Sequence, residues 1–97
     1  MILHKTAIPQ RNDNSMIEKI LGDEIILYNK SNHNIHNLNK TTALVWNLCD
    51  GEMTISEMIN YLIENFKGSK EVIAHDVMQI LEEMEKINLI TFESHIR

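Results

Sequence analysis

The sequence of 97 residues predicts one small α+β domain, in which a three-stranded antiparallel meander is followed by three helices and a short C-terminal strand. Short extended stretches rich in β-branched residues, separated by turn residues, fill residues 16–38. From Asn39 onward, the apolar residues instead recur every three or four positions, as they do in amphipathic helices. The apolar fraction of 43% at this length supplies one hydrophobic core but not two.

The first 15 residues show no sustained hydrophobic period. Pro9 and the polar run at residues 10–15 are typical of a segment without regular structure. We therefore expect residues 1–15 to form a flexible arm, or an arm swapped with a second copy of the chain. Residues 16–97 are expected to form the domain.

Residues 16–21 and 24–29 are predicted to form a hairpin around the turn dipeptide Gly22-Asp23. The small polar residues at positions 30–33 predict a second turn, because such residues tolerate tight backbone angles. Residues 34–38 then complete the meander as a third strand. This strand is polar, which favours a position at the edge of the sheet rather than at its centre.

The first helix is expected to begin after Asn39, a good N-cap residue, because residues 42–48 are apolar apart from Asn47. Apolar side chains cover most of the circumference of this helix, which predicts a central and buried position. Asp50-Gly51 is expected to end the helix, with the glycine supplying the left-handed cap.

A capping box of Thr54 and Glu57 predicts the start of a second helix. Its apolar residues keep the spacing of three and four positions that defines one buried face. Gly68-Ser69 is expected to end this helix and to cap the next one.

The third helix is expected at residues 70–87, followed by Asn88 in a left-handed C-cap and by a strand at residues 89–93. Three helices followed by a strand resemble a winged helix-turn-helix, whose third helix normally enters a groove of DNA. Here that helix carries five carboxylates against two lysines, and the whole chain has 14 acidic and 9 basic residues. Because carboxylates repel a phosphate backbone, the charge argues against nucleic acid as a partner.

The formal net charge of −5 also argues against an anionic membrane surface as a partner. No apolar run reaches the roughly 20 residues that span a bilayer, and the first residues lack the pattern of a signal peptide. The single cysteine, Cys49, excludes an internal disulfide. We therefore expect a cytoplasmic protein without a membrane partner.

The residue types that bind metals or carry catalysis do not occur in a recognisable constellation. Of the 5 histidines, His33 and His36 stand close together, but no Cys, Asp or Glu cluster at ligand spacing joins them. Cys49 is expected to be a buried structural thiol at the end of the first helix. With no glycine-rich phosphate loop either, we expect no metal, no cofactor and no enzymatic activity.

The segment at residues 38–51, LNKTTALVWNLCDG, is similar to the LN-x-x-(T/S)A-x-x-(I/V)W-x-L-x-(D/E)G signature of PqqD-like proteins. These proteins are the stand-alone form of the recognition element for ribosomally synthesised and post-translationally modified peptides (RiPPs). The meander before the signature and the capping box after it also match. Asn88-Leu89-Ile90 stands where the family usually has Gly-Leu-(Ile/Val), and the resemblance spans about residues 16–90.

The resemblance implies a winged-helix-like module that holds the leader segment of a precursor peptide while a partner enzyme modifies or cleaves the core segment. The partner would be a radical SAM maturase, a leader peptidase or a cyclase. In the family, the leader adds as an extra strand along the third strand, in a groove closed by the third helix. The oligomeric state stays open between a monomer and a domain-swapped homodimer. The alternative function is a winged-helix transcription regulator or a dimerisation module.

The residues themselves favour the same mode of binding, because an edge strand with unpaired backbone groups accepts an extended peptide by strand addition. A helical wheel places one mixed apolar and acidic flank of the third helix beside the core stripe. The candidate peptide-binding residues on the strand and on this flank are Asn34, Ile35, His36, Asn37, Leu38, Val72, Asp76, Gln79, Ile80 and Glu83.

Three alternatives remain open for the residues of the third helix. Val72 and Ile80 fit plain core packing equally well, and Asp76 fits local hydrogen bonding. The opposite flank is the other candidate for the groove wall, and it comprises Ala74, Met78 and Glu85.

Overall fold

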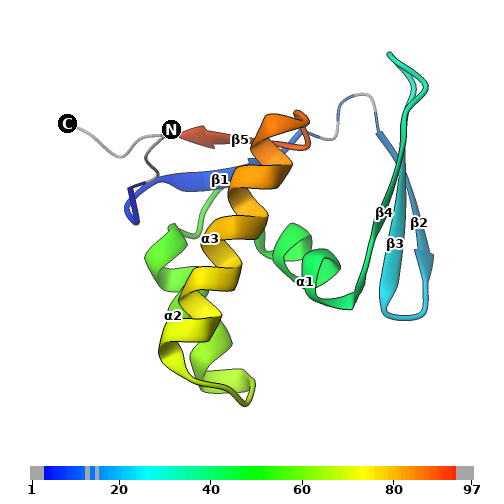
Figure 1. Cartoon of the computed structure of the whole chain (residues 1–97). Helices are drawn as coiled ribbons and strands as arrows, with labels where there is room; N and C mark the ends of the chain where they lie inside the picture. The colour runs from blue at the N-terminus through cyan, green and yellow to red at the C-terminus, as the bar shows by residue number, and fades with distance from the viewer. Residues whose placement is uncertain (1–3, 13, 15, 94–97) are drawn as a thin grey trace.

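The computed structural model of the chain describes residues 4–12, 14 and 16–93. The elements in chain order are β1 (Ile8–Arg11), β2 (Met16–Leu21), β3 (Glu24–Asn29), β4 (Ile35–Leu38), α1 (Lys40–Leu48), α2 (Ile55–Asn65), α3 (Lys70–Lys86) and β5 (Ile90–Glu93). Figure 1 shows α1 between the β2–β3–β4 sheet on the right and α2 and α3 on the left. The predicted fold class is confirmed: an antiparallel meander, three helices and a C-terminal strand.

The meander pairs in the order β2-β3-β4, with every pair antiparallel. Gly22 takes the positive φ of 62° that the two-residue turn between β2 and β3 requires. In the next turn, the side-chain oxygen of Asn29 accepts hydrogen bonds from the backbone N–H groups of Ser31 and Asn32. The turn ends with His33 at a φ of 64°, so β4 begins at Ile35, one residue later than predicted.

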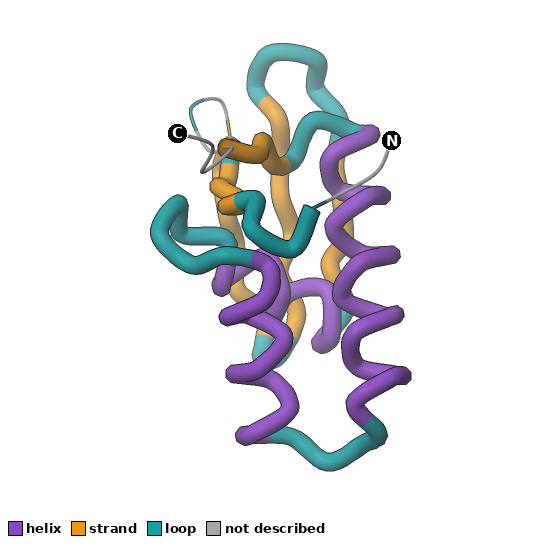
Figure 2. Tube along the Cα trace, turned by 90° about the vertical axis from the view of Figure 1, so that its left-hand side faces the viewer, coloured by secondary structure: helices purple, strands orange, loops and turns teal. Residues whose placement is uncertain are grey.

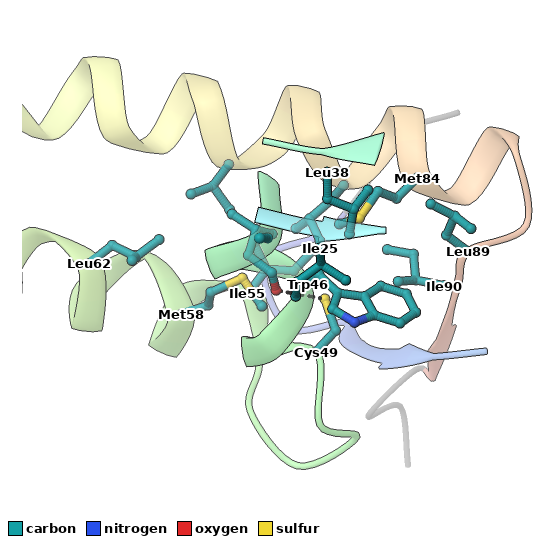
Figure 3. Close-up of a cluster of buried hydrophobic side chains, with 14 of the residues drawn as sticks. Ile25, Leu38, Trp46, Cys49, Ile55, Met58, Leu62, Met84, Leu89 and Ile90 are labelled. Carbon is teal, nitrogen blue, oxygen red and sulfur yellow. Dashed lines mark hydrogen bonds between the residues drawn. The ribbon is translucent and has the colours of Figure 1, made fainter. Parts of the chain in front are cut away.

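The core is built around α1, as its apolar circumference predicted. Ala43, Val45 and Trp46 of this helix are buried against both β3 and α3. The indole Nε1–H of Trp46 donates to Glu18 Oε1 at 3.1 Å, so the one polar atom of this large side chain has a partner. Figure 3 shows the surrounding cluster, in which side chains of α2, β3, β4 and the chain after α3 meet the indole.

The predicted N-caps of all three helices are confirmed. Asn39 Oδ1 accepts from the backbone N–H of Thr42, and Ser69 Oγ accepts from that of Val72. Thr54 and Glu57 satisfy each other's backbone N–H groups as a complete capping box.

The ends of the helices agree less uniformly with the prediction. Asn88 has a φ of 62°, which confirms the left-handed conformation after α3. Gly51 also has a positive φ of 80°, but α1 already ends at Leu48 with Cys49 as its C-cap. The glycine therefore shapes the following turn rather than capping the helix.

The structure differs from the sequence expectation at the N-terminal segment. Ile8–Arg11 forms β1, which pairs antiparallel with β5 of the same chain, whereas residues 1–15 were expected to form a flexible arm or an arm swapped with a second copy. The strand is held by tertiary contacts, because its partner lies at the other end of the chain and Ile8 is buried in the core. Residues 1–3, 13 and 15 of the predicted arm lie outside the described residues.

Figure 2 shows α2 and α3 as two neighbouring columns joined by a short turn at the bottom of the view. Within the described part of the chain, no helix has the length and apolar character needed to cross a membrane.

Candidate functional site

The strand β4 forms one edge of the three-stranded sheet, because β3 is its single neighbour in that sheet among the described strands. Leu38 and His36 pair with the buried residues Ile25 and Leu27 of β3. Side chains of paired residues point to the same face, so Leu38 and His36 point toward the helices. Ile35 and its second neighbour, Asn37, therefore point to the opposite, outer face.

The backbone of β4 presents hydrogen-bonding groups to the open side. The backbone N–H of Asn29 donates to the carbonyl of Asn34 at 2.9 Å, which places Asn34 in a hydrogen-bonded pair. Because such pairs alternate along an antiparallel ladder, His36 and Leu38 also direct their backbone groups at β3. Ile35 and Asn37 then direct their N–H and C=O groups away from the sheet, where an added strand would pair.

A groove of about 320 Å³ runs between this edge and the C-terminal half of α3. Its apolar lining includes the buried side chains of Leu38, Met84 and Leu89, and its rim includes the half-exposed Ile87. Figure 3 shows Leu38 and Met84 next to each other beneath the end of α3. The complete lining is Ile35, His36, Asn37, Leu38, Thr42, Ile80, Glu83, Met84, Ile87 and Leu89.

Six of the ten residues predicted from the sequence line this groove. They are Ile35, His36, Asn37, Leu38, Ile80 and Glu83. Of the described lining residues, Glu83 is the one Asp or Glu, and no Lys or Arg is among them. The flank of α3 that faces β4 therefore runs through Ile80 and Glu83, and Ala74, Met78 and Glu85 of the opposite flank are not among the lining residues.

The other four predicted residues lie outside the groove. Asn34 lies between the turn and β4, and its backbone N–H donates to Asn32 Oδ1 at 2.9 Å. Val72, in the first turn of α3, is 57% exposed, so the alternative of core packing is wrong for it. Gln79 lines another hollow along α3, which shares Glu83 with the groove.

Asp76 lies near the groove but not in it. Its Oδ1 is 3.6 Å from Nδ1 of the neighbouring His75, and both side chains are largely exposed. Asp76 and Ile80 line a second hollow of about 220 Å³ among α1, α2 and α3. Ile80 lines both hollows, so the two hollows adjoin at this residue.

Four lining residues were not predicted from the sequence: Thr42, Met84, Ile87 and Leu89. Ile87 has the signal that could have found it, because it follows Ile80 and Glu83 at helical spacing of seven and four positions. Met84 and Leu89 look like core residues in the sequence, and they are indeed buried while forming the floor of the groove.

Of the groups that could carry covalent chemistry, the His36 imidazole lies in the groove, whereas the Cys49 thiol lies in the core. The Cys49 thiol is fully buried and donates to the carbonyl of Val45 at 3.2 Å. Burial raises the pKa of Cys49 to about 12, which keeps it a neutral thiol rather than a nucleophilic thiolate. His33 Nδ1 is 2.8 Å from the hydroxyl of Tyr28. Among the described residues, no three His, Cys, Asp or Glu side chains are grouped so as to hold a metal ion.

Comparisons with known proteins identify a chain of similar fold and the family of this sequence. A solved structure with a similar fold is "TbiB1 in Complex with the TbiA(beta) Leader Peptide". The two chains superpose with a TM-score of 0.72 and share 14% identity, over 84% of this chain and 93% of that chain. At this identity the likeness shows a common fold.

The sequence comparisons give a more specific result. No curated protein matches this chain significantly in sequence. The family model described as "Coenzyme PQQ synthesis protein D (PqqD)" matches residues 24–90, which is well over half of the chain and includes the signature segment, β3, β4 and all three helices. The resemblance found in the sequence is thereby confirmed, and the chain belongs to the PqqD family.

Proposed function

We propose that this protein is a non-catalytic module that captures the leader segment of a ribosomally made precursor peptide and presents it to a modifying or cleaving enzyme. The observation that carries the proposal is the pairing of an open strand edge with an apolar groove. Ile35 and Asn37 offer backbone groups to a new strand, and the wall of α3 lies directly beside them. Membership of the PqqD family and the leader peptide in the TbiB1 structure support it.

The charge of the site favours a leader that is neutral or basic where it touches α3. Glu83 stands in the groove, whereas Asp76 lines a neighbouring hollow together with Lys40 and Lys67. A lysine or arginine of the leader would therefore pair with Glu83, and an acidic residue at that point would be repelled. The same carboxylates argue against the alternative of a DNA-binding regulator, since α3 would have to approach phosphates.

The partner enzyme belongs to the proposal as well, because the described lining of the groove offers apolar, amide, carboxylate, hydroxyl and imidazole groups but includes no cysteine or lysine as a nucleophile. A radical SAM maturase, a leader peptidase or a cyclase would supply the reaction, and the meeting of enzyme and precursor would take place in the cytoplasm. The module would contribute local concentration and orientation of the substrate.

Titration of a labelled leader peptide tests the proposal directly. The peptide would come from a precursor encoded beside this gene, and fluorescence anisotropy would report its binding. We expect a dissociation constant of about 10 µM or below. A folded protein that shows no binding at tenfold higher concentration contradicts the proposal, and retarded migration of promoter DNA in a gel-shift assay would favour the regulator instead.

A further inference from the structure

Three apolar side chains form a row across the outer face of the sheet. Ile17 of β2 pairs with Tyr28 of β3, and Tyr28 pairs with Ile35 of β4. These three residues, called here the outer row, lie on the face opposite the buried Ile25 and Leu27. The row is uncovered, since Ile17 is 52% exposed and Ile35 is 65% exposed.

We propose that the docked peptide is read on both faces of the sheet, and that the peptide residue opposite Ile35 is an apolar β-branched or aromatic residue that extends the outer row. This inference rests on the proposed function and adds a second specificity surface to it. The groove beside α3 would then read only alternate residues of the peptide.

The register of the sheet gives this arrangement when the peptide adds as an antiparallel strand. Ile35 directs its backbone groups outward, so the peptide residue opposite it exchanges both hydrogen bonds with it, at a Cα separation of about 5.5 Å. The side chain of that peptide residue points to the same face as Ile35. The next peptide residue, opposite His36, points toward the groove and α3.

The second row of the outer face predicts a different preference. Asn37 pairs with Ile26, and Ile26 pairs with Lys19. A peptide residue opposite Asn37 therefore meets an amide and is expected to be polar. The pattern across three successive peptide residues is apolar toward the outer row, apolar toward the groove, and polar toward Asn37.

The size of the outer row favours a single strand as its occupant over the body of an enzyme. A stable protein interface buries about 800 Å² on each partner, which is a larger surface than three side chains in one line offer. One peptide side chain placed beside Ile35 would extend that line by one residue. The row also ends at β4, at the same edge where the backbone groups of Ile35 and Asn37 point outward. A peptide that docks there extends the row without any further contact surface.

Selection of peptides from a random display library of twelve-residue sequences tests this inference with a defined probe. For the wild-type protein, we expect selected peptides in which two apolar residues occupy adjacent positions and therefore opposite faces. Ile35→Thr keeps a β-branched residue but removes apolar surface from the outer row. Ile87→Thr is the matched control, since it removes apolar surface at the groove rim.

Each variant is expected to lose the preference for an apolar residue at a different peptide position. Ile35→Thr should lose it at the position facing the outer row, and Ile87→Thr at the position facing the groove. A serine at the outer-row position of the best peptide should weaken binding to the wild type about fivefold, but binding to Ile35→Thr less than twofold. The inference is overturned if the serine weakens binding equally in both proteins, or if the selected peptides show no preferred residue at that position. Either result leaves the proposed function standing. A library without any binder contradicts the proposed function and this inference together.

A second copy of the chain is the competing occupant of the row, and sedimentation distinguishes it. We expect the wild type and Ile35→Thr to have the same molecular mass by analytical ultracentrifugation. A wild-type dimer that dissociates in Ile35→Thr would assign the outer row to self-association and overturn the inference.

Discussion

The outer edges of β1 and β4 differ in whether another segment of the chain covers them. The outer edge of β1 is covered by the chain itself: the backbone N–H of Arg11 donates to Cys49 O at 3.0 Å, and that of Gly51 donates to Pro9 O at 3.1 Å. The edge of β4 has no such cover, and none of the hydrogen bonds between separate segments in the described residues uses the backbone of Ile35 or Asn37.

The difference shows which edge is structural and which is available for a partner. An uncovered edge invites unwanted pairing, and proteins usually cover, shorten or charge it. Here β4 has only four residues. The groove beside it has an apolar floor and the carboxylate of Glu83. The closed edge of β1 contributes to folding, and the open edge of β4 provides the proposed binding surface.

The largest expected effect lies in the core beneath both edges. Trp46→Ala removes a side chain that is 1% exposed and leaves Glu18 without its indole donor. We expect the free energy of unfolding to fall by about 3–5 kcal/mol, measured by urea denaturation. A variant with unchanged stability would contradict the central position of α1.

The segment that covers β1 is expected to weaken at high pH. Burial raises the pKa of Cys49 from 9.0 to about 12, so the folded state keeps the proton that the unfolded state loses. Stability should therefore be full below pH 9 and decline as the pH rises toward about 12. Each pKa unit corresponds to about 1.4 kcal/mol, so the loss reaches up to roughly 4 kcal/mol.

Cys49→Ala is the control for this pH dependence, because it removes the thiol and leaves the other titrating groups in place. The difference in stability between the two proteins, measured by urea denaturation from pH 7 to 11, isolates the contribution of the thiol. If both proteins lose stability in parallel, the thiol is not the group responsible.

Two isoleucines on the two edges allow a matched comparison. Ile8 of β1 is 6% exposed, whereas Ile35 of β4 points outward. We expect Ile8→Ala to cost about 2–4 kcal/mol and Ile35→Ala about 0.5 kcal/mol or less. Thermal unfolding measures both, and similar losses would show that the β4 edge is part of the structural core.

The smallest expected effect on stability belongs to the backbone of the open edge. Ile35→Pro removes an N–H that points away from β3, so the β3–β4 ladder keeps its hydrogen bonds. We expect leader affinity to fall about tenfold or more. The melting temperature should change less than it does in Trp46→Ala. Calorimetric titration and thermal unfolding measure the two quantities on the same sample.

Ile20→Pro supplies the control at the other edge of the same sheet. In the alternation set by the pairing of Leu21 with Glu24, the N–H of Ile20 also points away from β3. This variant should keep leader affinity. Equal loss of affinity in both variants would indicate a general effect of proline on the sheet rather than docking at β4.

The helices and the meander could be predicted from the sequence because their signals are local. Asn39, Thr54 and Ser69 each cap a helix through a backbone group three residues away. The polar residues Asn34, His36 and Asn37 within residues 34–38 likewise indicated an edge strand before its neighbour was known. Such short-range hydrogen bonds and hydrophobic periods can be recognised within a short stretch of sequence, without knowledge of the tertiary structure.

The site could be predicted only in part, because a helical wheel gives the angle of a side chain but not its position along a neighbouring strand. α3 has 17 residues, which is about 25 Å of helix, whereas the four residues of β4 span about 13 Å. The strand therefore flanks half of the helix. Ile80 and Glu83 fall beside it, and Val72 on the same flank does not.

The amino-acid sequence alone predicted the order of the elements from β2 onward, the N-caps of the helices, the acidic character of α3 and the resemblance to the PqqD family. The tertiary structure decided which strand edges are closed and which are open. The pairing of β1 with β5 and the cover by residues 49–56 join segments far apart in the chain, and no local period encodes them. The groove floor arises in the same way, since Leu38, Met84 and Leu89 are core residues that become a binding surface only where packing leaves one side of them beside an open strand.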